Sequence, residues 1–252
     1  MAPNSPSKKH KRLRIFAGPN GSGKTTILKL IDDSYDLGIY INADEIEQQL
    51  REQGYINLDE YGINDFDESR FSDQLKKHSL LKKAKKDGYQ IDIILQSNKI
   101  VNPDKNTHSY EAALIADIIR YELLQQGKKM SFETVMSHKS KIEFFKQATE
   151  SGYKVYLYFI CTESADINVE RVELRVEKGG HPVAPKKIVS RYKNSLGLLK
   201  DAIPHCYRTF IFDNSEDQAL LILEVTKGGS IEILQEEIPH WVDDHLLRHF
   251  NL

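Results

Sequence analysis

Chemistry is indicated first by a glycine-rich segment near the N-terminus, Gly18-Pro19-Asn20-Gly21-Ser22-Gly23-Lys24-Thr25, which fits G-x-x-x-x-G-K-[ST] at every fixed position. Glycines allow a loop to wrap its backbone amides around an anion without obstruction by side chains. Lys24 is placed to bridge the β- and γ-phosphates. The hydroxyl of Thr25 is placed to ligate Mg²⁺, and Thr26 follows directly after it. An apolar segment over 13–17 precedes the motif and a helical pattern over 25–31 follows it. This context predicts a site for ATP or GTP with Mg²⁺.

Two acidic residues are candidates for the remaining chemistry. Asp44 follows a short apolar segment, 37–41, and would lie at the carboxyl edge of the sheet, where it could orient a substrate hydroxyl and accept its proton. The alternative is that Asp44 only caps the helix predicted over 45–53. Glu133 ends the next apolar segment, 130–132, and could hold Mg²⁺ directly or through water. The alternative for Glu133 is a structural role in a turn.

Three arginines suggest a mobile cover for the triphosphate. Arg171 and Arg175 are four residues apart on one predicted helix and therefore share a face, and Arg191 lies on the next helix beyond a Gly-Gly loop. Guanidinium groups in such a lid neutralise the charge that spreads over a transferred phosphoryl group. Glutamates at 170, 173 and 177 leave a second interpretation open, a solvated face of ion pairs.

These residues must be positioned by alternating strands and helices. We expect strands over 13–17, 37–41, 130–133, 153–161 and 208–213, with helices over 109–126, 140–151, 167–177 and 185–199 among them. Such alternation predicts an α/β fold of the P-loop NTPase type, similar to small-molecule kinases, with a parallel sheet and helices on both faces. Residues 1–12 are expected to be a disordered basic lead-in and 13–252 one domain. An insertion at about 54–106, with a Lys-rich helix over 69–86 and a hairpin near 89–101, and a helical lid at about 167–199 complete the prediction.

Composition excludes several function classes. The 252 residues include 35 Lys and Arg against 37 Asp and Glu, a net charge of −2, which disfavours a protein that coats nucleic acid. No apolar run approaches the about 20 residues of a membrane span. The first residues lack the apolar stretch of a signal peptide, and the 2 cysteines cannot form a disulfide framework. We therefore expect a cytoplasmic protein.

The motifs together resemble the zeta-toxin family of P-loop kinases, specifically its chromosomal branch of predicted ATPases. The similarity covers 13–53 and 109–216 and rests on segments in family order: the glycine-rich loop through Thr26, Asn42-Ala43-Asp44-Glu45, Phe132-Glu133-Thr134-Val135-Met136-Ser137, Gly152-Tyr153, Arg171 with Arg175, Gly179-Gly180-His181, Arg191-Tyr192 and Asp213-Asn214-Ser215. The resemblance implies phosphorylation of a sugar hydroxyl on a UDP-sugar and an antitoxin protein as partner. It implies that Lys24 and Thr25 hold the triphosphate and Mg²⁺, that Asp44 is the catalytic base, and that Glu133 and Thr134 lie at substrate and metal. Arg171, Arg175 and Arg191 would clamp phosphates.

Two functions from different classes follow. The first is a kinase acting on a small molecule. The second is a nucleotide-dependent regulatory module that acts through a protein partner, motivated by the insertion and by Glu133-Thr134-Val135, where the toxins carry a glycine between the glutamate and the threonine.

Overall fold

The computed structural model describes residues 11–103 and 107–249. The chain divides into two compact units: one comprises residues up to Leu37 and from Ser131 onward, and the other is Gly38–Met130. The insertion predicted over 54–106 falls inside the second unit, which also includes the segments on either side of it. Most of the lead-in predicted over 1–12 lies outside the described residues, and Arg12 already begins the first strand.

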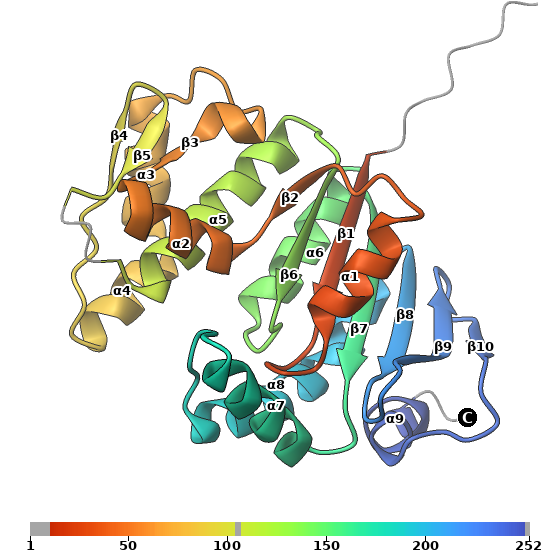
Figure 1. Ribbon diagram of the computed structural model, residues 1–252. Helices are drawn as coiled ribbons and strands as arrows, with labels where there is room; N and C mark the ends of the chain where they lie inside the picture. The colour runs from red at the N-terminus through yellow and green to blue at the C-terminus, as the bar shows by residue number, and fades with distance from the viewer. Residues whose placement is uncertain (1–10, 104–106, 250–252) are drawn as a thin grey trace, which may run out of the picture. The chain divides into compact units, whose positions relative to one another are not determined.

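The first unit is organised around a sheet whose strands follow the order β10-β9-β8-β7-β1-β6. Figure 1 shows β1, β7 and β8 in the middle of this sheet. The strands are β1 (Arg12–Ala17), β6 (Met130–Thr134), β7 (Lys154–Cys161), β8 (Arg208–Asp213), β9 (Leu220–Thr226) and β10 (Ile231–Ile233). β1, β7 and β8 are parallel, whereas β9 and β10 are antiparallel to their neighbours. The predicted parallel sheet is therefore confirmed, with two antiparallel strands added at one edge.

The middle strands form the core of this unit. Ile15 pairs with Leu157 in the β1–β7 register, and both side chains are fully buried. Successive residues of β1 are buried as well, because helices flank the sheet and leave neither face of a middle strand in water. The helices are α1 (Lys24–Asp32), α6 (Ser140–Glu150), α7 (Ala165–Glu177), α8 (Pro185–Ala202) and α9 (His240–His245). No helix among the described residues is long and apolar enough to cross a membrane.

The second unit combines helices with a small sheet of its own. The elements of this unit are β2 (Ile39–Ile41), α2 (Ala43–Gln53), β3 (Tyr55–Asn57), α3 (Glu68–Lys77), α4 (Ser79–Lys86), β4 (Ile94–Gln96), β5 (Lys99–Val101) and α5 (Ser109–Gln125). The small sheet has the order β3-β5-β4. The predicted hairpin is present as β4 and β5, joined through Ser97 and Asn98, which both have positive φ. β3 pairs with β5 on the other side. Helix α5 is buried around most of its circumference, including Glu122, which accepts hydrogen bonds from α3.

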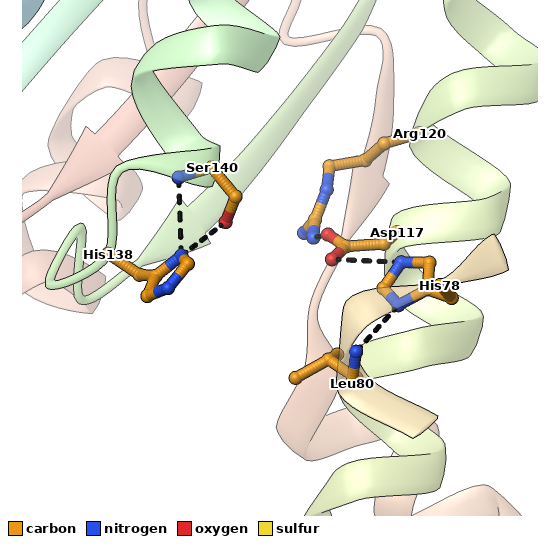
Figure 2. A network of polar contacts seen from close by, with 6 residues as sticks. All are labelled: His78, Leu80, Asp117, Arg120, His138 and Ser140. Carbon is orange, nitrogen blue, oxygen red and sulfur yellow. Dashed lines mark hydrogen bonds and ion pairs between the residues drawn. The ribbon is translucent and has the colours of Figure 1, made fainter. Parts of the chain in front are cut away.

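The prediction of one continuous helix over 69–86 is wrong. The Lys-rich segment forms α3 and α4 rather than a single helix, because His78 between them adopts an extended backbone. Nδ1 of His78 accepts a hydrogen bond from the amide of Leu80 at 3.3 Å, and Nε2 faces Asp117 at 3.6 Å (Figure 2). Asp117 also pairs with the buried guanidinium of Arg120. Burial lowers the pKa of Arg120 to about 10. The imidazole thus replaces a helical hydrogen bond and starts the second helix.

Both cysteines should be unreactive in the folded protein. Cys161 and Cys206 are buried, and burial raises the pKa of each thiol from its ordinary 9.0 to about 12. Because the folded state favours the protonated thiols, their contribution to stability is complete below about pH 9 and is lost as the pH rises toward 12. At pH 8 we expect Ellman's reagent to label neither thiol in native protein and both in guanidinium chloride. Labelling of native protein at the denatured rate would contradict this burial.

Candidate phosphate-binding site

The glycine-rich motif forms a loop between β1 and α1, at the carboxyl end of β1 (Figure 1). Gly18, Gly21 and Gly23 have φ of 147°, 79° and 90°. A Cβ on Gly18 would lie 1.9 Å from the carbonyl oxygen of Ile160, and one on Gly21 would lie 2.6 Å from that of Asn168. The loop therefore needs glycine both for its backbone angles and for its close approach to β7 and α7.

Helix α1 begins at Lys24, directly after the loop, and Gly23 at its N-cap provides no side-chain cap. In its first turn the amide of Thr26 donates to the carbonyl of Gly23 at 3.1 Å, and a helix N-terminus that no side chain caps is the arrangement that binds phosphate. The Nζ of Lys24 donates to the carbonyl oxygens of Gly18 and Pro19 at 3.0 and 2.8 Å, which places its charge across the loop. Inside the loop, the hydroxyl of Ser22 is buried without a hydrogen-bond partner among the described residues.

The hydroxyl of Thr25 lies against the carboxylate of Glu133. Its Oγ1 donates to Oε1 and Oε2 at 3.1 and 3.2 Å, and Glu133 comes from the end of β6. The ends of β1 and β6 are tied together, since the amide of Gly18 donates to the carbonyl of Thr134 at 3.2 Å. Thr134 itself makes the turn that was one alternative for Glu133, because its hydroxyl accepts from the amide of Met136. The two residues predicted to share a metal ion are thus brought together.

The three arginines make different contacts. Arg191 on α8 donates to the side-chain oxygen of Asn20 in the loop at 2.9 Å. Arg171 donates to backbone carbonyls at 214–216, after β8, and Arg175 to the carbonyl of His181 at 2.8 Å. In the described contacts both α7 arginines bond to carbonyl oxygens and not to the glutamates of their own helix, so the alternative of a face of ion pairs is not what this helix shows.

Two asparagines at the loop were not among the predicted site residues. Asn168 on α7 donates to the carbonyl of Asn20 at 2.7 Å, and Asn214 after β8 donates to the carbonyl of Ser22 at 2.9 Å. Asn214 was visible in the sequence only as part of a family segment. Asn168 gave no signal, because an asparagine inside a helical pattern has no characteristic spacing.

Asp44 belongs to the second unit, where it lies in the first turn of α2 and is exposed. The alternative that it caps this helix is wrong. The helix begins at Ala43, two residues earlier than predicted, and its N-cap is Asn42, whose Oδ1 accepts from the amide of Asp44 at 2.9 Å. The carboxylate of Asp44 is therefore not used by the helix N-terminus, and its role as a base stays a prediction.

Buried groups behind the loop remain neutral at ordinary pH. Burial, with a smaller contribution from Cys161, raises the pKa of Tyr192 on α8. Its hydroxyl donates to the carbonyl of Thr162 at 2.7 Å, and the Thr162 hydroxyl donates in turn to the side chain of Asn168. Tyr192, Thr162 and Asn168 thus form a hydrogen-bonded group of neutral side chains between β7, α7 and α8.

Replacing Gly21 by alanine should impair the loop without unfolding the protein. The new methyl group would meet the Asn168 carbonyl at 2.6 Å with φ at 79°, a conformation that costs an L-residue about 1–2 kcal/mol. We expect the affinity for ATP, measured by calorimetry, to fall at least about tenfold, since 1.4 kcal/mol corresponds to a factor of ten. Gly197→Ala on α8, where an added Cβ meets nothing within 4 Å, is the matched control and should leave affinity unchanged. Equal affinity in both variants would contradict the loop's role.

No protein-family model matches the chain. An uncharacterized protein of Haemophilus influenzae is 33% identical over 69 residues, which are 27% of this chain and 49% of that protein. The chain thus spans about half the length of the curated relative it matches.

Solved structures extend the likeness to nearly the whole chain. A native AvrRxo1-ORF1:-ORF2 complex contains a chain with a TM-score of 0.53 and 17% identity, and the same complex with sulphate ions gives 0.51 and 17%. Each match covers 89% of this chain and 61% of that one. A chain of the PezAT toxin–antitoxin system of Streptococcus pneumoniae matches at a TM-score of 0.45 and 14% identity over 87% of this chain and 75% of that one, too distant to carry an argument. The AvrRxo1-ORF1:-ORF2 likeness shows the fold. The chain has an α/β P-loop fold.

Proposed function

We propose that this protein is a P-loop kinase that transfers the γ-phosphate of ATP or GTP to a hydroxyl group of a small molecule. The observation that carries the proposal is the loop itself: glycines at positive φ after a strand end, a helix N-terminus without a side-chain cap, and the ammonium of Lys24 held by two loop carbonyls. This combination suits a polyphosphate, because it provides backbone donors, a helix dipole and a point charge at one place.

The residues present fit Mg²⁺ as well as the nucleotide. The Thr25 hydroxyl and the Glu133 carboxylate adjoin each other, and oxygen ligands of this kind are those that Mg²⁺ prefers. Among the described residues no cluster of three or more His, Cys, Asp or Glu could hold a metal, so the remaining ligands would be phosphate oxygens and water. ATP supplies the phosphoryl group when bound, and Mg²⁺ neutralises its charge.

The other predicted residues are assigned the remaining roles. Asp44 would accept the proton of the attacking hydroxyl as the new ester bond forms, and ADP or GDP would leave. Arg191 is the arginine best placed for the phosphates, since its guanidinium already contacts Asn20 of the loop. Arg175 would have to exchange its present carbonyl partner for phosphate oxygens. Arg171 has five N–H donors and would reach a phosphate with one that its three carbonyl partners leave over. Thr134, beside Glu133 at the end of β6, is proposed to meet the acceptor.

The acceptor and the partner remain finer proposals. The resemblance to zeta toxins makes a UDP-sugar the first acceptor to test, and it makes an antitoxin protein the partner. The two AvrRxo1-ORF1:-ORF2 structures of similar fold are complexes of two proteins, which supports a protein partner for this chain too. A cytoplasmic location fits all of these substrates.

The test is phosphoryl transfer from ATP labelled in its γ-phosphate, with Mg²⁺, to a panel of UDP-sugars and nucleosides. A labelled acceptor that is absent with Lys24→Ala protein would support the kinase and identify the acceptor class. Tight binding of ATP without any labelled acceptor, in the panel or in a small-molecule extract of cells, would favour the regulatory module instead.

A further inference from the structure

A loop that binds anions through its amides must keep its peptide groups turned the right way. In a trans peptide the C=O of one residue and the N–H of the next point in opposite directions. No cis peptide bond occurs in the described chain. Fixing the carbonyl of Asn20 therefore fixes the amide of Gly21, and fixing the carbonyl of Ser22 fixes the amide of Gly23.

Asn168 fixes the first of these peptide groups. Its side chain is fully buried, and Nδ2 donates to the carbonyl of Asn20 at 2.7 Å. The Asn20 carbonyl can only accept, so it settles the orientation of the amide group: Nδ2 faces that carbonyl, and Oδ1 faces the Thr162 hydroxyl. The backbone of Asn168 also lies close enough to Gly21 to exclude any side chain there. The amide of Gly21 is thereby directed away from α7.

Asn214 fixes the second peptide group, which joins Ser22 and Gly23. Its backbone amide donates to the carbonyl of Cys161 at 2.8 Å, which anchors the residue to β7, and its Nδ2 donates to the carbonyl of Ser22 at 2.9 Å. A Cβ on Gly23 would lie 2.2 Å from that same Nδ2, so the contact is made at the glycine itself. The amide of Gly23 is thereby directed away from Asn214.

Arg171 connects the two asparagines. It lies one turn after Asn168 on α7, and its guanidinium donates to the carbonyls of Asn214, Ser215 and Glu216. The bonds to Ser215 and Glu216 are 3.1 and 3.2 Å long. Helix α7 therefore holds both the loop, through Asn168, and the segment that carries Asn214, through Arg171.

We propose that Asn168 and Asn214 are positioning residues that orient the amides of Gly21 and Gly23 toward the phosphates, with Arg171 holding the second asparagine in place. The inference rests on the proposed nucleotide binding. Without these donors the carbonyls of Asn20 and Ser22 lose their partners, and each peptide group can turn. A carbonyl oxygen that faces the bound anion repels that anion. The loss should fall on phosphate affinity and spare contacts to the nucleoside.

The experiment compares Asn168→Leu and Asn214→Leu with wild type by calorimetry, using inorganic tripolyphosphate, MgATP and adenosine as separate probes. Leucine is close to asparagine in shape and adds no charge, so it removes only the hydrogen bonds. Asn194→Leu is the matched control, because Asn194 is exposed on α8. We expect the Kd for tripolyphosphate to rise about tenfold for each variant, the ratio for one lost hydrogen bond to a group that faces an anion.

Thermal unfolding followed by circular dichroism shows which variants are folded at the assay temperature. Asn214 is only half-buried, so Asn214→Leu carries the test if Asn168→Leu does not fold. Unchanged tripolyphosphate affinity in a folded variant would overturn the inference, and so would equal losses for tripolyphosphate and adenosine. Failure of wild type to bind tripolyphosphate or MgATP would instead contradict the proposed function.

Discussion

Replacing Lys24 by alanine should reduce phosphoryl transfer at least about a hundredfold, the usual cost of removing one preorganised donor from a charge that develops in the transition state. Two loop carbonyls hold the ammonium of Lys24 at 3.0 and 2.8 Å, which keeps it over the loop before any nucleotide arrives. Because the charge on the transferred group spreads as the bond to ADP breaks, the cation stabilises the transition state more than the ground state. The measurement is kcat/KM for transfer from ATP.

Lys29→Ala is the control for this prediction. Lys29 is exposed in the last turn of the same helix, and its removal changes the net charge by the same amount. We expect kcat/KM within about twofold of wild type, since single exposed charges are screened. Equal losses for Lys24→Ala and Lys29→Ala would mean that net charge, and not the loop, governs the reaction.

Asp44→Asn should lower kcat by about 10²–10⁴-fold, the range for removal of a general base, with ATP affinity nearly unchanged. Asparagine keeps the shape of aspartate but cannot accept the proton of the attacking hydroxyl. The fold should tolerate the change, because the helix is capped by Asn42 and uses only the backbone amide of Asp44. The kinetics of transfer and the calorimetric Kd for MgATP, measured on the same protein, separate the chemical step from binding.

Glu52→Gln serves as the matched variant. Glu52 is an exposed acid on the same helix, and it accepts a hydrogen bond from Gln48 that glutamine can also accept. It should leave both kcat and Kd unchanged. A full rate for Asp44→Asn would remove Asp44 from the mechanism, while a parallel loss of ATP binding would assign it to nucleotide binding.

Those parts of the fold that consecutive residues determine could be predicted from the sequence. The loop at Gly18–Thr25 follows an apolar strand and opens a helix, and Ser97 and Asn98 form the turn of the predicted hairpin. The break at His78 was not predicted, since no glycine or proline marks it and the imidazole that starts α4 is held by Asp117 from another helix. Strand β9 was also missed, and with it the antiparallel edge of the sheet.

The same limit applies to the candidate site. Lys24 and Thr25 belong to one short motif, whereas Asn168 and Asn214 contact the loop across 148 and 192 residues of chain. Nothing in the neighbourhood of either asparagine indicates its partner. The sequence predicted Arg171 as a phosphate ligand, and the contacts at 214–216 add a role that only the folded arrangement of α7 and β8 creates.

The most direct test of the kinase proposal is the balance of products. Phosphorus NMR of a reaction containing MgATP, the protein and a small-molecule extract of cells measures ADP, free phosphate and phosphate esters together. The proposal predicts one new phosphate ester for each ADP formed, with no matching rise in free phosphate, and neither product with Lys24→Ala. Formation of free phosphate in step with ADP, and of no ester, would contradict the kinase and identify a nucleotide hydrolase.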